Sequence, residues 1–156
     1  AVGLGLVLED KESSVPPVEQ NKACEQYFNL KQFHKGYRAC LNARSLDVDP
    51  KSGIKTLLND CRNILSDKNN ETENAACLVG LAIHQKLLKR EDIARRFQKC
   101  GENKVTYQDR DFLACLTAAS LTYFTDKKSA QNACREIYTN AKSRSRNDCL
   151  NSLNLF

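Results

Sequence analysis

Eight cysteines divide most of this 156-residue chain into four units of similar length. They stand at positions 24, 40, 61, 77, 100, 115, 134 and 149, so that separations of 15 or 16 residues alternate with separations of 19 to 23. The first cysteine of each unit recurs after 37, 39 and then 34 residues. A period of this size is typical of repeat proteins, in which each repeat is one supersecondary element.

The second cysteine of each unit begins a local pattern of its own. Leu follows it directly, a small residue stands three positions later, and Leu or Ile stands six positions later. These three positions lie near one face of a helix, where the small residue allows a neighbouring helix to approach closely. The small residues are Ala43, Gly80, Ala118 and Ser152.

Polar, breaker-rich stretches lie between the two cysteines of each unit, for example residues 66–71 and 140–147. The pattern predicts a helix, a turn and a second helix in each unit. Antiparallel helices bring positions equidistant from their loop close enough for a disulfide, which closes about 15 residues and contributes roughly 3 kcal/mol in the chain-entropy model. The predicted disulfides are Cys24–Cys40, Cys61–Cys77, Cys100–Cys115 and Cys134–Cys149.

A second pairing scheme would cross the long gaps between units. It joins Cys40 to Cys61, Cys77 to Cys100 and Cys115 to Cys134, and it leaves Cys24 and Cys149 to meet end to end. A solenoid holds its two ends apart, so this scheme is disfavoured.

The expected fold is all-α: a right-handed α/α helical-repeat solenoid of about eight helices with four disulfides. An extended N-terminal arm occupies residues 1–17, and the disulfide-linked domain occupies residues 18–156. Asp49-Pro50 suits a turn before a helix, and Asp126 is the expected N-cap of the seventh helix. The helices are expected at 18–31, 36–46, 51–66, 72–88, 91–101, 109–124, 127–140 and 147–155.

The cysteine usage favours disulfides over metal ligation. Metal sites prefer cysteines separated by two to four residues, whereas the nearest cysteines here are 15 positions apart and there are only two histidines. We therefore expect no metal, no cofactor and an extracytoplasmic location, in the periplasm, at the cell surface or in the secreted fraction. No run approaches the ~20 apolar residues of a membrane span.

Segments 93–100 and 129–134 contain Ala and end in Cys, like the second helix of a repeat, and Ala76-Cys77-Leu78-Val79-Gly80 is similar to the first helix of the repeat that follows. In these segments the chain resembles the tetratricopeptide superfamily and its Sel-like branch, most of all the secreted cysteine-rich bacterial members. The resemblance covers residues 20–156 and implies a protein-binding scaffold. The intercysteine loops are about twice as long as in that family, and its glycine is kept only at Gly80. No functional residue carries over.

The candidate binding residues lie in and beside a basic segment. Residues 86–99 hold six Lys or Arg residues against two acidic residues, a net charge of +4 on a chain with a net charge of +5. Such a surface could meet an acidic protein or an anionic glycan, although a solvated helix face is the simpler interpretation. The candidates are His84, Lys89, Arg90, Arg95 and Arg96.

Other polar features are weaker candidates. Lys142, Arg144 and Arg146 form a second basic cluster, and Asn70-Glu71-Thr72 is a glycosylation sequon in an expected loop. His34 is interpreted as a loop histidine. Aromatic residues do not interleave with the basic ones, so nucleic acid is not an expected partner.

The expected function is an extracytoplasmic protein- or peptide-binding helical-repeat module. No catalytic triad, phosphate loop or zinc-protease motif is found, so we do not expect an enzyme. The alternatives are a cell-envelope enzyme or small-ligand-binding protein, and a secreted effector or inhibitor. We also hypothesise that the apolar run Ala1–Leu8 docks on a concave face of this or a neighbouring molecule and influences the oligomeric state; a disordered tail is the alternative.

Overall fold

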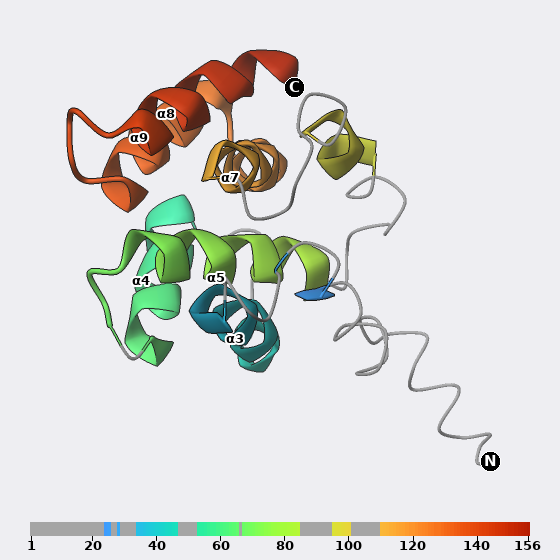
Figure 1. Cartoon of the computed structure of the whole chain (residues 1–156), viewed down its shortest axis with the longest axis vertical. Helices are drawn as coiled ribbons and strands as arrows, with labels where there is room; N and C mark the ends of the chain where they lie inside the picture. Colours follow the sequence, from blue (N-terminus) through green and yellow to red (C-terminus); the bar gives the residue numbers. More distant parts are fainter. Residues whose placement is uncertain are drawn as a thin grey trace.

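The computed structural model describes residues 24, 25, 28, 34–46, 53–65, 67–84, 95–100 and 110–156. Within these ranges all regular structure is helical, which confirms the all-α class. Figure 1 shows the arrangement of the helices. They are α3 (His34–Asn42), the 3-10 turn η1 (Ala43–Ser45), α4 (Ile54–Ile64), α5 (Glu71–His84), α7 (Arg110–Phe124), α8 (Lys127–Ile137), α9 (Arg144–Ser152) and η2 (Leu153–Leu155), and residues 95–100 are helical as well.

Seven of the eight expected helices lie in this described part of the chain. For the first, expected at 18–31, only Cys24, Glu25 and Phe28 are described, and Cys24 and Glu25 are helical. The arm at 1–17 and the Asp49-Pro50 turn lie outside the described residues. The last helix begins three residues earlier than expected, because the Ser143 hydroxyl accepts a hydrogen bond from the Arg146 amide and caps it there.

The four predicted disulfides are confirmed. The paired Cα atoms are 6.0 Å apart for Cys24–Cys40, 5.9 Å for Cys61–Cys77, 5.7 Å for Cys100–Cys115 and 5.9 Å for Cys134–Cys149. All eight cysteines are used in this way, so the scheme that crosses the long gaps is excluded. Each bond joins the first helix of a unit to its second helix, for example α4 to α5 and α8 to α9.

The helices α5 and α7 form the centre of the molecule. Every residue of α5 from 73 to 84 is buried, and so is every residue of α7 from 112 to 121. A helix that is covered on all sides needs apolar or small residues around its whole circumference, which both sequences supply. In Figure 1, α3 and α7 cross α5 on opposite sides.

The second helices of the units pack against one another in chain order, α3 on α5, α5 on α7 and α7 on α9. This order is the one expected for stacked helical pairs. A further contact joins α4 to α8, in the second and fourth units, where Arg62 Nη2 donates to the Glu136 carbonyl over 3.4 Å. Strict solenoids make contacts only between neighbouring repeats, so the right-handed solenoid stays a prediction.

The cap of α8 is as the sequence predicts. Asp126 has extended backbone angles, and its Oδ1 accepts a hydrogen bond from the Ser129 amide over 2.8 Å. This bond also holds the pKa of Asp126 below its usual value. None of the helices in the described ranges is long and apolar enough to cross a membrane.

Candidate functional site

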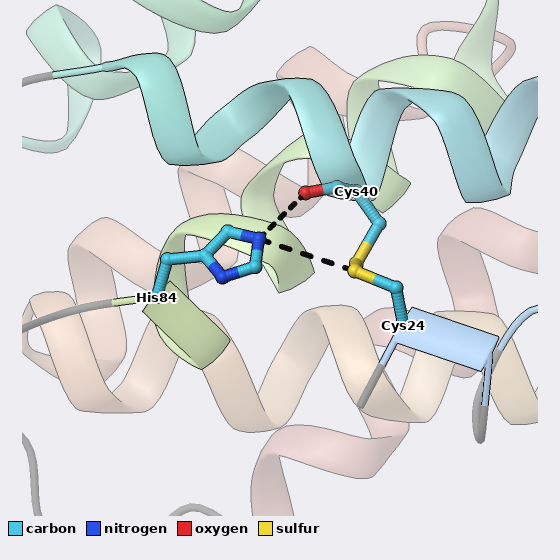
Figure 2. Close-up of side chains that lie close together, drawn as sticks. All are labelled: Cys24, Cys40 and His84. Carbon is cyan, nitrogen blue, oxygen red and sulfur yellow. Dashed lines mark hydrogen bonds between the residues drawn. A yellow bond between two sulfur atoms is a disulfide. The ribbon is translucent and has the colours of Figure 1, made fainter. Parts of the chain in front are cut away.

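Two regions of the described structure contain several polar groups next to buried side chains. The first is the surrounding of His84, the last residue of α5. Its Nε2 lies 2.9 Å from the carbonyl oxygen of Cys40 and 3.9 Å from Sγ of Cys24. Figure 2 shows one ring nitrogen facing both groups, with the Cys24–Cys40 disulfide beside the ring. His84 therefore connects the end of α5 to α3.

The hydrogen bond at Nε2 fixes the state of this imidazole. A carbonyl oxygen only accepts, so Nε2 carries a proton, and in the neutral ring Nδ1 then carries the lone pair. The side chain is 7% exposed, and its burial lowers the pKa of His84, an effect that the bond to Cys40 partly opposes. Nδ1 is buried and finds no hydrogen-bond partner within the described part of the chain. His84 is a neutral helix-joining residue.

The same residues form the one group in the described ranges with the spacing of metal ligands. The Sγ atoms of Cys24 and Cys40 and a ring nitrogen of His84 all lie within 4.8 Å of one another. Zinc and similar ions bind the thiolate form of cysteine. Here both sulfur atoms are joined to each other, so in the oxidised protein they do not supply that ligand.

The basic segment predicted as a binding surface is only partly described. Arg95 is exposed, whereas Lys89 and Arg90 lie outside the described residues. Arg96 contacts its own chain: Nη1 donates to Thr122 Oγ1 over 2.8 Å, and the guanidinium lies 6.0 Å from the Tyr123 ring centre.

Lys99 is held in a similar way at the chain end. Its Nζ donates to the Leu155 carbonyl over 3.3 Å and lies 5.8 Å from the ring centre of Phe156. Arg96 and Lys99 thus join helical residues 95–100 to α7 and to the C-terminal turn. His84 contacts α3, whereas Arg96 contacts α7.

The second basic cluster is also used internally. Arg146 donates hydrogen bonds to three backbone carbonyls at the end of α8. Arg144 lies 3.9 Å from the Asp148 carboxylate, while Lys142 is exposed. Two of the three cations therefore serve the helical hairpin of the fourth unit. The side chain of the predicted loop histidine, His34, lies outside the described part; its backbone begins α3.

The second polar place is a cleft of about 520 Å³ between two loops. One wall is the loop before α5 together with the first turn of α5, and the other is the loop between α8 and α9. Both loops are the intercysteine stretches of their units, the second and the fourth. We call this the interloop cleft. Its lining residues are Asp67, Asn69, Asn70, Glu71, Thr72, Leu113, Tyr138, Thr139, Asn140 and Ser145.

Local turns hold these walls in place. Asp67 Oδ1 accepts from the Asn69 amide over 3.1 Å, and Asn70 Oδ1 accepts from the Glu73 amide over 2.9 Å, which caps α5. On the other wall, Asn140 Oδ1 accepts from the Lys142 amide over 3.0 Å. Asx turns and caps of this kind fix a loop without strands or metals. The sequon Asn70-Glu71-Thr72 is thus part of the cleft.

Tyr138 supplies the most buried polar group of the lining, at 3% exposure. Its hydroxyl lies 3.2 Å from Thr117 Oγ1. Burial raises the pKa of Tyr138 far above its usual value, and the charges of Glu71 and Asp148 raise it further. The phenol therefore stays neutral. The carboxylates of Glu71 and Asp148 both influence its pKa.

Sequence reasoning identified both walls as loops but not the cleft. The available signal was the repeat itself: if the hairpin loops of successive units lie at one end of a helix stack, loops of different units can meet there. Hydroxyl, amide and carboxylate groups line the cleft.

Comparison with known proteins returned no matching family model, no matching curated protein and no matching solved structure. The resemblance to tetratricopeptide and Sel-like repeats therefore stays an expectation that depends on the residues quoted for it.

Proposed function

We propose that this protein is an extracytoplasmic module that binds a protein or peptide, with the interloop cleft as its binding site. The observation that carries the proposal is a polar cleft of about 520 Å³ whose two walls are loops of different units. A volume of a few hundred Å³ suits one or two side chains of a partner. Loops presented by a rigid framework are common binding elements.

The disulfides support the location and the rigidity that this function needs. Four within-unit bonds are compatible with an oxidising compartment. The bonds of the second and fourth units close the very loops that form the cleft, Cys61–Cys77 and Cys134–Cys149. A preformed site loses less conformational entropy when it binds. In this proposal the units form a tetratricopeptide-like stack.

A selection from a random peptide library tests the proposal. The target is the full chain, and the counter-target is Thr139→Trp, which fills the cleft from an exposed position of its wall. The matched control is Thr56→Trp, at an exposed position of α4 that does not line the cleft. We expect selected peptides to bind the wild type and the Thr56 variant and to lose binding to the Thr139 variant.

Two results would overturn this function. One is a selection that yields no peptide above background. The other is a set of peptides that bind all three proteins equally, since their site would then lie elsewhere. Circular dichroism of each variant establishes that a loss of binding is not a loss of folding.

A further inference from the structure

We propose that the interloop cleft recognises an ammonium or guanidinium group, carried by a basic side chain of the bound peptide. The inference rests on the binding function proposed above and adds the chemical class of the ligand. It depends on the charge of the lining, on one carboxylate oxygen and on the size of the cleft.

The lining is acidic on a chain that is basic. Asp67 and Glu71 are its charged members, and none of the described residues that line it is Lys, Arg or His. The whole chain carries 24 basic against 19 acidic residues, so an acidic recess runs against the overall charge. A cleft lined by charges of one sign raises the local concentration of ligands that carry the opposite charge.

Glu71 supplies the more specific observation. Its Oε2 is buried and has no hydrogen-bond partner within the described part of the chain. A buried carboxylate oxygen without a partner is costly, and native structures satisfy such atoms with protein, water or a ligand. Because the Glu71 side chain as a whole is only partly buried, a rotation toward the cleft would let a bound cation with N–H donors satisfy this atom and offset its charge.

The neighbouring groups do not neutralise Glu71. Tyr138 is a neutral phenol whose hydroxyl already contacts Thr117, and Asp148 adds a second carboxylate near that phenol. The cation beside Asp148 is Arg144, at 3.9 Å and with a side chain that is 83% exposed. The guanidinium of Arg146 points to the carbonyls at the end of α8. The described residues that line the cleft therefore carry two carboxylates and no basic side chain, while the exposed Lys68 and Lys142 lie on the same two loops.

An organic cation suits this cleft better than a metal ion does. The metal-ligand spacing of three or more His, Cys, Asp or Glu groups occurs in the described ranges only at Cys24, Cys40 and His84. A cleft of about 520 Å³ is also far larger than a single ion. Amide and hydroxyl oxygens of the walls, such as those of Asn69, Thr139 and Ser145, offer further acceptors to a group with several N–H donors.

The test uses a blocked glycine pentapeptide with a central arginine and the same peptide with citrulline, which replaces the guanidinium by a neutral urea group. Binding is followed by NMR shifts of backbone amides in residues 67–72 and 138–140. We expect the arginine peptide to bind at least roughly tenfold more tightly than the citrulline peptide. We expect Glu71→Gln to weaken its binding roughly 10- to 100-fold.

The matched control is Glu25→Gln, which removes the same charge at an exposed residue outside the lining. Asp67→Asn is a second cleft variant that keeps an acceptor for the Asn69 amide. Both cleft variants should weaken the arginine peptide, whereas the Glu25 variant should bind as the wild type does. An unchanged melting temperature excludes unfolding as the cause.

The outcomes separate this inference from the function on which it rests. If citrulline and arginine peptides bind the cleft equally, cation recognition is overturned and peptide binding stands. If calcium chloride shifts the amides of residues 67–72 and 138–140 and the arginine peptide does not, recognition of an organic cation is also overturned. If agmatine, a free guanidinium amine, binds as tightly as the arginine peptide, cation recognition is supported and a small-molecule source replaces the peptide.

Discussion

The backbone of Gly80 in α5 lies against the carbonyl of Cys40 in α3. A β-carbon built on Gly80 would stand 2.5 Å from the Cys40 oxygen and 2.9 Å from the Cβ of Ala43. No described glycine has a positive φ, so this glycine is required for close approach and not for an unusual backbone conformation. Gly80 is the small residue three positions after the second cysteine of its unit, and it allows the close approach of two helices that the sequence predicts.

We predict that Gly80→Ala destabilises the protein by about 1–3 kcal/mol, which is typical of an overpacked core. Alanine is the better helix former by about 1 kcal/mol, so a net loss measures the clash between α3 and α5. Urea unfolding followed by circular dichroism gives the free energy. The rigid backbone oxygen cannot move aside as a flexible side chain would.

Gly53→Ala is the matched control. Nothing lies within 4 Å of a β-carbon at Gly53, which caps α4, so the change in the free energy of unfolding should stay below about 1 kcal/mol, the cost of placing alanine at an N-cap. Equal losses at Gly53 and Gly80 would contradict the close-approach explanation.

Arg146 closes the C-terminal end of α8. Its Nε donates to the Tyr138 carbonyl over 2.8 Å, and its Nη2 donates to the carbonyls of Arg135 and Thr139, each over 3.1 Å. Carbonyls at a helix end lack partners within the helix and carry partial negative charge. We predict that Arg146→Ala lowers the free energy of unfolding by roughly 2 kcal/mol, measured by chemical denaturation.

Arg144→Ala provides the control for charge. Arg144 has a largely exposed side chain, 83%, and a 3.9 Å contact to Asp148, so its loss should change stability by less than about 1 kcal/mol. Arg146→Lys should recover only part of the stability, because an ammonium lacks the planar fork that reaches three carbonyls. A lysine variant as stable as the wild type would show that charge alone matters.

The cysteine spacing predicted the pairing because the argument needs only local geometry. Two positions equidistant from a short loop must lie opposite each other on antiparallel helices, whatever the rest of the fold does. The interloop cleft could not be predicted in that way. It depends on how the second and fourth units meet, through contacts such as Arg62 with the Glu136 carbonyl, and these contacts leave no periodic signal.

Charge counting along the sequence also does not give the orientation of the candidate cations. The count cannot tell whether a guanidinium faces solvent or its own chain. Arg96 reaches Thr122 and Lys99 reaches Leu155, because both stand on the helical segment that must pack on α7. The prediction for Lys89 and Arg90 lies outside the described residues and stays a prediction.

Loss of one disulfide should weaken the fold without changing the remaining pairs. The double variant Cys134→Ala, Cys149→Ala opens a loop with a sequence separation of 15. In the chain-entropy model this costs about 3 kcal/mol, measured by urea unfolding. Non-reducing digestion and mass spectrometry should still find the three other pairs within their units. Any cross-unit pair in the wild type would contradict the structure.

The free energy of unfolding should decrease as the pH is lowered, because of the buried His84. Burial lowers the pKa of His84 in the folded state below its ordinary value of 6.5, so the unfolded chain binds the proton more readily. The contribution is complete above the unfolded value. The stabilising contribution of His84 is lost as the pH falls from 6.5 through the lower, folded pKa. The cause is that burial beside the Cys24–Cys40 disulfide disfavours the charged imidazolium.

His84→Gln isolates this effect, since an amide can still donate to the Cys40 carbonyl but does not titrate. Unfolding free energies measured by denaturant titration between about pH 5 and pH 8 should decline toward acid in the wild type and decline less in the variant. The difference between the two curves belongs to this imidazole, because every other titrating group is shared. Parallel curves would mean that His84 has the same pKa in the folded and unfolded chains, and would remove the basis for treating it as a neutral, buried joint between α5 and α3.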